Sequence, residues 1–171
     1  MKYLSLPEAI GPAVDALIKG RALLTVGGDA PNTMTIGWGY IGYSWNKPIF
    51  TVLVRPQRHT HDLLLKQGEF TVSLSLDDHM KKTFAFAGTQ SGRDVNKFEG
   101  HGLTAVPAEK VNAPIVKECT LHFECKTRLV QPMTEDQLDR EVLEKVYPER
   151  DLHTMVFGEI VSVYLTEEEE K

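Results

Sequence analysis

Two short segments carry the side chains best suited to binding a ligand. Residues 32–39 read NTMTIGWG and place small residues along one side of a predicted strand. Residues 55–61 read RPQRHTH and carry four cationic or ionisable groups in seven positions. A flat ring can lie along a strand of small residues, and cations can hold an anionic tail. The two segments together predict a site for a mononucleotide, in which a ring is joined to a phosphate.

The cations of the second segment stand at the predicted start of a helix. Thr60 is the expected N-cap, and the helix is expected to end at Gly68. A helix N-terminus carries partial positive charge and unpaired backbone N–H groups, so further cations beside it are unfavourable without an anion. A phosphate would relieve the repulsion and accept the free N–H bonds. The alternative is a surface turn with solvated cations, in which Pro56 sets the bend.

Several strands and helices must position these segments. Period-two alternation and short apolar runs bounded by turn residues are typical of strands. The predicted strands cover residues 22–27, 33–40, 49–55, 70–76, 117–130 and 155–166. Helices are predicted over residues 8–19, 60–68, 78–87 and 134–147, the third with Met80, Phe84 and Ala87 inward and the last with a Thr134/Gln137 capping box. Residues 88–102 form a polar loop, and residues 167–171 a solvated tail.

The arrangement of these elements favours a mainly β fold. The strands are long and joined by turns, without regular alternation of strand and helix, and this favours a closed antiparallel barrel over a doubly wound sheet. A length of 171 residues with 42% hydrophobic content fits one domain, residues 1–171, able to bury a full core.

Composition and missing motifs exclude several classes of protein. The net charge of −5 argues against a nucleic-acid partner, and no apolar run is long enough for a membrane span. Charged residues and a proline interrupt the N-terminal apolar stretch, so no signal peptide is expected and the protein is predicted to be cytoplasmic. The patterns GxGxxG, GxxxxGK[ST] and GxSxG are absent, which disfavours Rossmann, P-loop and α/β-hydrolase sites.

The two cysteines, Cys119 and Cys125, are six residues apart in one predicted strand. An extended segment would separate them by roughly 20 Å, which is beyond disulfide reach. Their even spacing places them on the same face, so both are expected to be buried free thiols. No metal site is expected, because the chain lacks CxxC and HxxxH spacings.

Motifs recurring in order along most of the chain give a family resemblance. The sequence resembles the flavin reductase-like, FMN-binding split-barrel family, close to its flavoredoxin branch. The resemblance covers residues 10–165. The residues that carry it are Asn32, Met34, Thr35 and Trp38, then Trp45, Lys47 and Pro48, then Arg55, Pro56, Arg58 and Thr60, then Gly88–Thr89, Ser91–Val95, Lys97–Phe98 and Gly102–Thr104, and finally His153 and Phe157–Ile160.

This resemblance implies a six-stranded antiparallel Greek-key split barrel with peripheral helices, a homodimer, and FMN bound near the dimer interface. By the same resemblance, the residues that line the isoalloxazine ring and ribityl chain are Asn32, Thr33, Met34, Thr35 and Trp38. Those that hold the phosphate are Arg55, Arg58 and Thr60, with Ser91 and Lys97 closing over it. The alternative for the loop is a plain turn, with Lys97 a solvated cation.

The function expected from this family is hydride transfer from NAD(P)H to a flavin, so the protein is predicted to be a flavin reductase. Because the flavin carries the redox chemistry, no catalytic side chain is required. His153 could contact a nicotinamide, and the alternative is a histidine at the barrel rim. Two other functions stay open: an FMN electron-transfer protein of the flavoredoxin or ferric reductase type, reduced by a redox protein, and a non-enzymatic FMN-binding protein.

Overall fold

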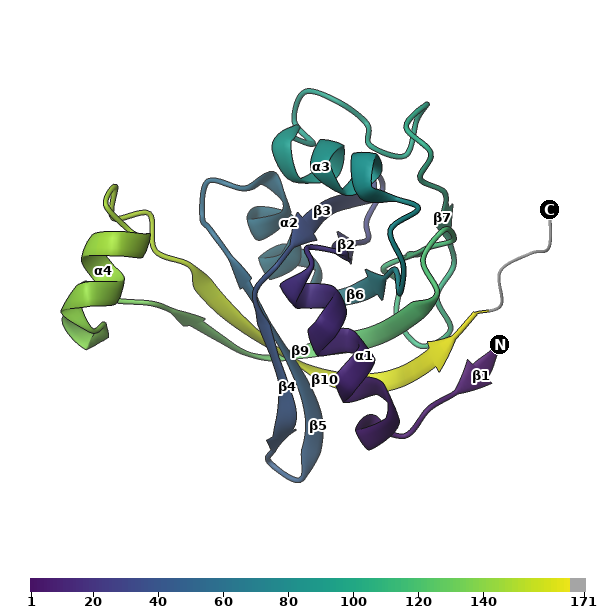
Figure 1. The fold of residues 1–171 in the computed structure, drawn as a ribbon, viewed down its shortest axis with the longest axis horizontal. Helices are drawn as coiled ribbons and strands as arrows, with labels where there is room; N and C mark the ends of the chain where they lie inside the picture. Colours follow the sequence, from purple (N-terminus) through teal and green to yellow (C-terminus); the bar gives the residue numbers. More distant parts are fainter. Residues whose placement is uncertain (167–171) are drawn as a thin grey trace.

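The computed structural model describes residues 1–166, and the predicted solvated tail, residues 167–171, lies outside them (Figure 1). Within these residues the strands are β1 (Lys2–Tyr3), β2 (Ala22–Val26), β3 (Asn32–Ile36), β4 (Gly39–Ser44), β5 (Lys47–Val54), β6 (Glu69–Leu74), β7 (Ala105–Val106), β8 (Ile115–Val116), β9 (Leu121–Pro132) and β10 (Thr154–Leu165). The helices are α1 (Leu6–Ile18), α2 (His59–Gln67), α3 (Lys81–Thr89), the 3-10 helix Glu135–Gln137 and α4 (Arg140–Val146).

The main sheet is antiparallel throughout and confirms the predicted mainly β class. Its strands follow the order β3-β2-β6-β9-β10-β5-β4, and β1 pairs with β10. Among residues 1–166 this sheet has eight strands, two more than the six predicted, because the short strand β1 is added and one predicted strand is divided into β3 and β4.

The divided strand closes the fold. Residues 33–40 were expected to form one strand, but β3 ends at Ile36 and β4 begins at Gly39. β3 and β4 lie at opposite ends of the sheet order. Three residues of extended chain reach roughly 11 Å at most, so the two ends of the sheet must approach each other here. The sheet therefore curls into a split barrel, with Gly37 and Trp38 crossing between its ends.

The barrel interior is the larger of two buried apolar clusters. It contains Phe50, Phe70 and Phe123, together with Cys125. Cys119 lies before β9 in a second cluster, with Met80 and Phe84 of the region around α3. The prediction of one shared face is therefore wrong, because the chain turns before β9 begins. Both cysteines are buried free thiols, as expected, and burial raises the pKa of each.

The predicted helix 134–147 is broken. A 3-10 turn follows Thr134, Leu138 is extended, and α4 begins only after Asp139. The carboxylate of Asp139 accepts bonds from the backbone N–H groups of Glu141 and Val142, at 2.9 and 3.2 Å. Aspartate is a stronger N-cap than threonine, so the helix starts at the later site and the predicted capping box is not formed.

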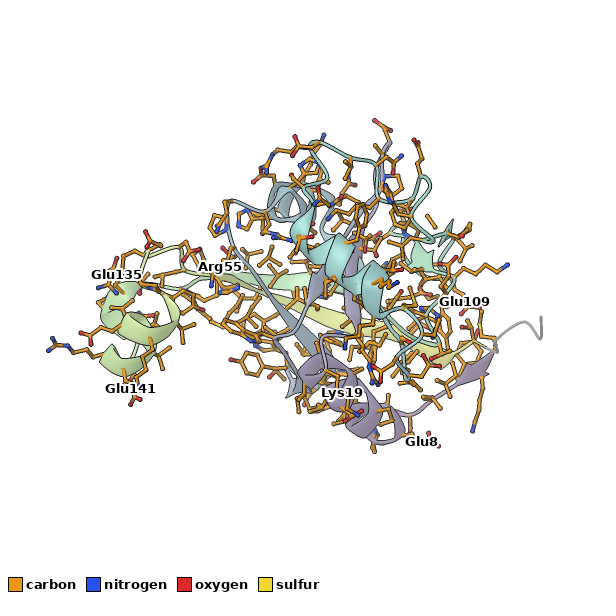
Figure 2. All side chains as sticks on the ribbon, turned by 45° about the horizontal axis from the view of Figure 1, so that its top comes forward. Glu8, Lys19, Arg55, Glu109, Glu135 and Glu141 are labelled. Carbon is orange, nitrogen blue, oxygen red and sulfur yellow. The ribbon has the colours of Figure 1, made fainter. Side chains whose placement is uncertain are left out.

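The outer parts of β9 and β10 form an arm that carries α4 away from the other helices (Figure 1). Figure 2 shows Glu135 and Glu141 on this arm and Arg55 near its base. Helices α2 and α3 lie close to β3 on the body of the barrel (Figure 1). Within the described residues, none of the helices has the length and apolarity that crossing a bilayer requires.

Candidate flavin site

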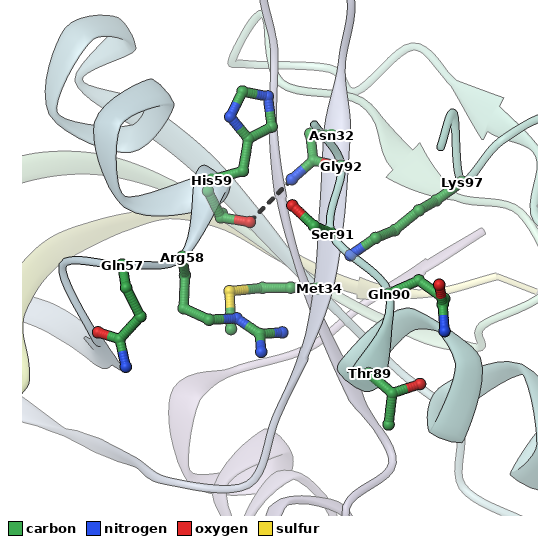
Figure 3. Close-up of a pocket in the computed structure, with 11 residues that line it drawn as sticks. Asn32, Met34, Gln57, Arg58, His59, Thr89, Gln90, Ser91, Gly92 and Lys97 are labelled. Carbon is green, nitrogen blue, oxygen red and sulfur yellow. Dashed lines mark hydrogen bonds between the residues drawn. The ribbon is translucent and has the colours of Figure 1, made fainter. Parts of the chain in front are cut away.

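A pocket lies where β3, the start of α2 and the segment after α3 meet (Figure 3). Its cavity volume is about 180 Å³. The residues that line it are Asn32, Met34, Gln57, Arg58, His59, Thr60, Thr89, Gln90, Ser91, Gly92 and Lys97. Six of the ten predicted cofactor residues are therefore brought together from three separate parts of the chain: Asn32, Met34, Arg58, Thr60, Ser91 and Lys97.

The start of α2 forms one wall of the pocket. Arg58 is its N-cap, and Thr60 is the second helical residue, so the prediction of Thr60 as N-cap is wrong. The physical reason is a competing contact: the buried Thr60 oxygen accepts a bond from Asn32 Nδ2 at 2.8 Å (Figure 3). Its own O–H can then donate elsewhere. The first turn of a helix also supplies backbone N–H groups without intrahelical acceptors.

Arg58 and Lys97 reach the pocket from opposite sides (Figure 3). Arg58 Nη2 donates to the carbonyl of Gly88 at 2.7 Å. Lys97 is only 3% exposed, and its Nζ donates to the carbonyls of Thr33 and Ala87, both at 2.8 Å. Lys97 is therefore a buried side chain, and the alternative of a solvated loop cation is wrong.

The electrostatics of this pair favour an anion. Burial, followed by the charge of Arg58, lowers the pKa of Lys97 to about 8. Burial and then the charge of Arg55 lower the pKa of Arg58. None of the eleven lining residues carries a carboxylate. Two partly desolvated cations without a counter-charge make the pocket electropositive.

The segment after α3 closes over the pocket by direct contact. A Cβ atom on Gly92 would lie 2.7 Å from Asn32 Cγ and 3.0 Å from His59 Cδ2, closer than side chains approach one another. Gly92 is therefore needed for this segment to rest on the strand and the helix. The Ser91 hydroxyl lies beside it on the pocket wall (Figure 3).

The other four predicted cofactor residues do not line this pocket. Thr33 is buried, and its hydroxyl is bonded to Thr25 and to the carbonyl of Leu24. The Thr35 hydroxyl donates to the Phe84 carbonyl at 2.6 Å. Trp38 and Arg55 belong to a neighbouring cluster described next.

This neighbouring cluster gathers around His153. The ring of Trp38, which is 48% exposed, lies 5.1 Å from that of His153. His153 Nδ1 shares a hydrogen bond of 2.8 Å with the Tyr147 hydroxyl. Arg55 lies over the Tyr147 ring and forms an ion pair with Asp151. Burial, and then the charge of Arg55, lower the pKa of His153 to about 4, so its imidazole is neutral at pH 7.

Some of these residues were not predicted. Gln57 lies inside the RPQRHTH segment, and Thr89, Gln90 and Gly92 belong to the polar loop, so their position in these motifs was a usable signal. Tyr147 and Asp151 had no such signal. They lie just before β10, and only the folding of the chain back towards β5 brings them beside Arg55. No group of three or more metal-ligating His, Cys, Asp or Glu residues is found within residues 1–166.

Comparison with known proteins defines the class. The chain combines a split barrel with an electropositive pocket of hydroxyl, amide and cationic donors. The model of the family described as "Flavin reductase like domain" matches residues 15–171, and the chain belongs to this family.

Individual relatives and solved structures are also similar to this chain. An uncharacterised protein of Archaeoglobus fulgidus is 33% identical over 141 residues, which cover 82% of this chain and 69% of that protein. Flavoredoxin of Desulfovibrio vulgaris (Miyazaki F) is 27% identical with a TM-score of 0.67, over 86% of this chain and 69% of its own. The NADH:FAD oxidoreductase of Streptomyces globisporus has a TM-score of 0.66 at 21% identity, over 86% and 75%, and shows the shared fold.

The residues present fit the phosphate of a flavin nucleotide. The convergent groups are donors: the Arg58 guanidinium, the Lys97 ammonium and the Thr60 and Ser91 hydroxyls, beside a helix N-terminus. A phosphate accepts charge-assisted bonds from such groups and favours the positive end of a helix.

Proposed function

We propose that this protein binds FMN and works as an NAD(P)H-dependent flavin reductase. The observation that carries the proposal is the convergence of Arg58 and Lys97 beside the first turn of α2, with no carboxylate lining the pocket. One terminal phosphate dianion satisfies this set of donors, which favours FMN over FAD and riboflavin. Family membership supports a flavin as the ligand.

The residues of the chain would bind and orient, while bound FMN would supply hydride and electron transfer. Arg58, Thr60, Ser91 and Lys97 would hold the phosphate, and Asn32 and Met34 would line the adjoining chain. His153 would offer a neutral imidazole beside the exposed Trp38, in a place where a nicotinamide could approach. We therefore propose His153 as a substrate contact.

The size of the cavity supports a homodimer with the flavin near its interface. A cavity of about 180 Å³ is small beside the roughly 300–1,000 Å³ usual for ligand sites, so the ring would extend beyond it. Trp38, Tyr40, Tyr43 and Trp45 are large exposed side chains around β4 that a second copy could cover. Light scattering of the flavin-loaded protein should give twice the chain mass, and a fully loaded monomer would contradict the proposal.

A second candidate is an FMN electron-transfer protein of the flavoredoxin or ferric reductase type. The 27% identity with a protein named flavoredoxin favours it. In that case a redox protein would reduce the flavin in place of NAD(P)H. A third candidate is an FMN-binding protein without redox turnover. None of the contacts described above favours it. A cytoplasmic location remains a prediction from the sequence.

The absorption spectrum of the purified protein, followed by anaerobic titration with NADH and with NADPH, tests these candidates. Bleaching of the bound flavin by either nucleotide would support the reductase. Reduction only by a protein donor would support the second candidate. A protein that takes up no flavin, even when FMN is added in excess, would refute all three.

A further inference from the structure

We propose that Arg93 is a positioning residue that fastens residues 90–97 across the first turn of α2, and so controls how fast the flavin enters and leaves. This inference rests on the proposed FMN site and concerns its regulation. Arg93 itself does not line the pocket. It would act through its neighbours Ser91 and Gly92, which do.

Arg93 forms hydrogen bonds to two residues at the N-terminal end of α2. Its Nη1 donates to the backbone carbonyl of Gln57 at 3.0 Å, and its Nη2 donates to the carboxylate of Asp62 at 3.2 Å. Gln57 precedes the N-cap of α2, and Asp62 lies in its first turn. One guanidinium therefore spans the helix N-terminus, which is the proposed phosphate position.

The Asp62 carboxylate, which accepts one of the two Arg93 bonds, is itself held by a neighbouring side chain. Asp62 Oδ1 lies 3.2 Å from His61 Nδ1, and the other ring nitrogen of His61 lies 3.1 Å from the Thr154 hydroxyl. Thr154 is the first residue of β10. The carboxylate that receives Arg93 is thus connected to the barrel, and a fixed acceptor restricts the segment that carries the donor.

The segment is also anchored at its two ends. The Gln90 N–H donates to the carbonyl of Phe86 at 3.0 Å, which closes the end of α3. At the other end the buried ammonium of Lys97 donates to carbonyls of β3 and α3. Between them, the N–H groups of Asp94 and Val95 donate to the Ser91 carbonyl at 3.1 and 3.2 Å. Arg93 therefore provides the central attachment of a segment whose ends are fixed.

Opening of the Arg93 attachment would free the residues that cover one side of the pocket, Gln90, Ser91 and Gly92. Gly92 rests so closely on Asn32 and His59 that even one added carbon would collide with them. Ser91 and Gly92 line the pocket, so an outward movement of residues 91–93 would widen the path of a phosphate into and out of it. The side chains of Arg93 and Asp62 are 46% and 64% exposed, and pairs this exposed are weak enough to open. Arg93 therefore slows exchange without sealing the site, as expected for a retained cofactor.

The first experiment measures FMN association and dissociation by stopped-flow fluorescence. Arg93→Ala should raise both rate constants roughly fivefold, the upper end for an exposed ion pair, and leave Kd within about twofold. Arg93→Lys keeps one donor nitrogen, so its two rate constants should lie between those of Arg93→Ala and wild type. Asp94→Ala, which removes a neighbouring charge of the same segment, should match wild type. Faster dissociation with unchanged association would show direct ligand contact and overturn the proposal, as would no change in either rate.

A cycle of variants identifies the acceptor. Asp62→Asn should accelerate FMN association and dissociation less than Arg93→Ala does, because the Gln57 carbonyl still accepts a bond from Arg93. The double variant should be no faster than Arg93→Ala alone. Independent, multiplying effects would show that Arg93 does not act through Asp62 and would overturn this part of the proposal.

Amide hydrogen exchange of the flavin-free protein separates this inference from the proposed function. Residues 90–97 should exchange faster in Arg93→Ala than in wild type or Asp94→Ala, while β9 should be unchanged. Unchanged exchange in residues 90–97 would overturn the attachment even if FMN binds. Failure of wild type to bind FMN, with the exchange difference present, would instead refute the proposed function and leave the attachment established.

Discussion

The ammonium nitrogen of Lys97 lies 2.8 Å from the carbonyl oxygen of Thr33, a residue 64 positions earlier in the chain. This bond ties the loop after α3 to β3, and it buries a cation on the wall of the proposed phosphate site. A buried ammonium that donates two bonds to carbonyls still has one N–H left for a ligand.

Lys97 should make FMN binding depend on pH. At pH 7, Lys97→Ala should raise the FMN Kd roughly tenfold, near 1.4 kcal/mol, and because Lys97 is buried this loss should depend only weakly on salt. The pKa of Lys97 is about 8 without ligand, so wild-type affinity should fall as pH rises above that value, towards that of the variant. FMN fluorescence titration between pH 6 and 10 measures this. A constant difference between the two proteins across the range would exclude Lys97 as the titrating cation.

The phosphate assignment should separate FMN from riboflavin. Arg58→Ala and Thr60→Ala each remove a donor from the helix start and should weaken FMN by about 1.5–3 kcal/mol, with a much smaller effect on riboflavin. Arg55→Ala is the matched control, because Arg55 is engaged with Asp151 and Tyr147. It should change both affinities alike. Equal weakening of the two ligands by Arg58→Ala would refute a phosphate at α2.

Gly92→Ala should disrupt the pocket while leaving the barrel intact. The added methyl would collide with Asn32, so either this side chain or residues 91–93 must shift. FMN binding should weaken roughly tenfold or more, while the urea midpoint should change little because residues 91–93 lie outside the main core. Gly11→Ala, where nothing lies within 4 Å, is the control and should leave FMN affinity unchanged. Tight FMN binding by Gly92→Ala would show that the segment does not rest on Asn32.

Gly158→Ala should destabilise the barrel itself. A Cβ atom here would lie 2.6 Å from Phe70 Cε1 and 2.8 Å from Cys125 Cβ, inside the main core. Overpacking of this kind costs about 1–3 kcal/mol, which a urea unfolding curve detects as a lower midpoint. An unchanged midpoint would mean that β10 does not press against Phe70.

Protonation of His122 should lower the folding stability of the protein in acid. Burial lowers its pKa from 6.5 to about 4, so the unfolded chain binds more protons than the folded chain between these values. Stability should therefore fall as pH drops from 6.5 to 4, by up to about 3 kcal/mol from this group. His122→Gln should be less stable at pH 7, since it loses bonds to Ser73 and Cys119, but its acid loss should be smaller. His101→Gln, at an exposed position, should keep the wild-type slope.

Features that depend on nearby residues could be predicted from the sequence. The cationic helix start at residues 55–61, the helix end at Gly68 and the core strands are signalled by charge, turn residues and periodicity within a few positions. The resemblance to the flavin reductase-like family rested on motifs of the same short range, and family membership confirmed it.

Features that depend on distant pairing could be decided only by the tertiary structure. Thr60 has the side chain of an N-cap, yet it is recruited by Asn32, 28 residues away. Residues 33–40 alternate like one strand, but closure of the barrel divides them between two ends of the sheet. Arg55 belongs to the same cationic segment as Arg58, yet its ion-pair partner in the structure is Asp151, far along the chain. In each case a contact across a long loop outweighs local preference, because burial and desolvation depend on what the whole chain brings to that point.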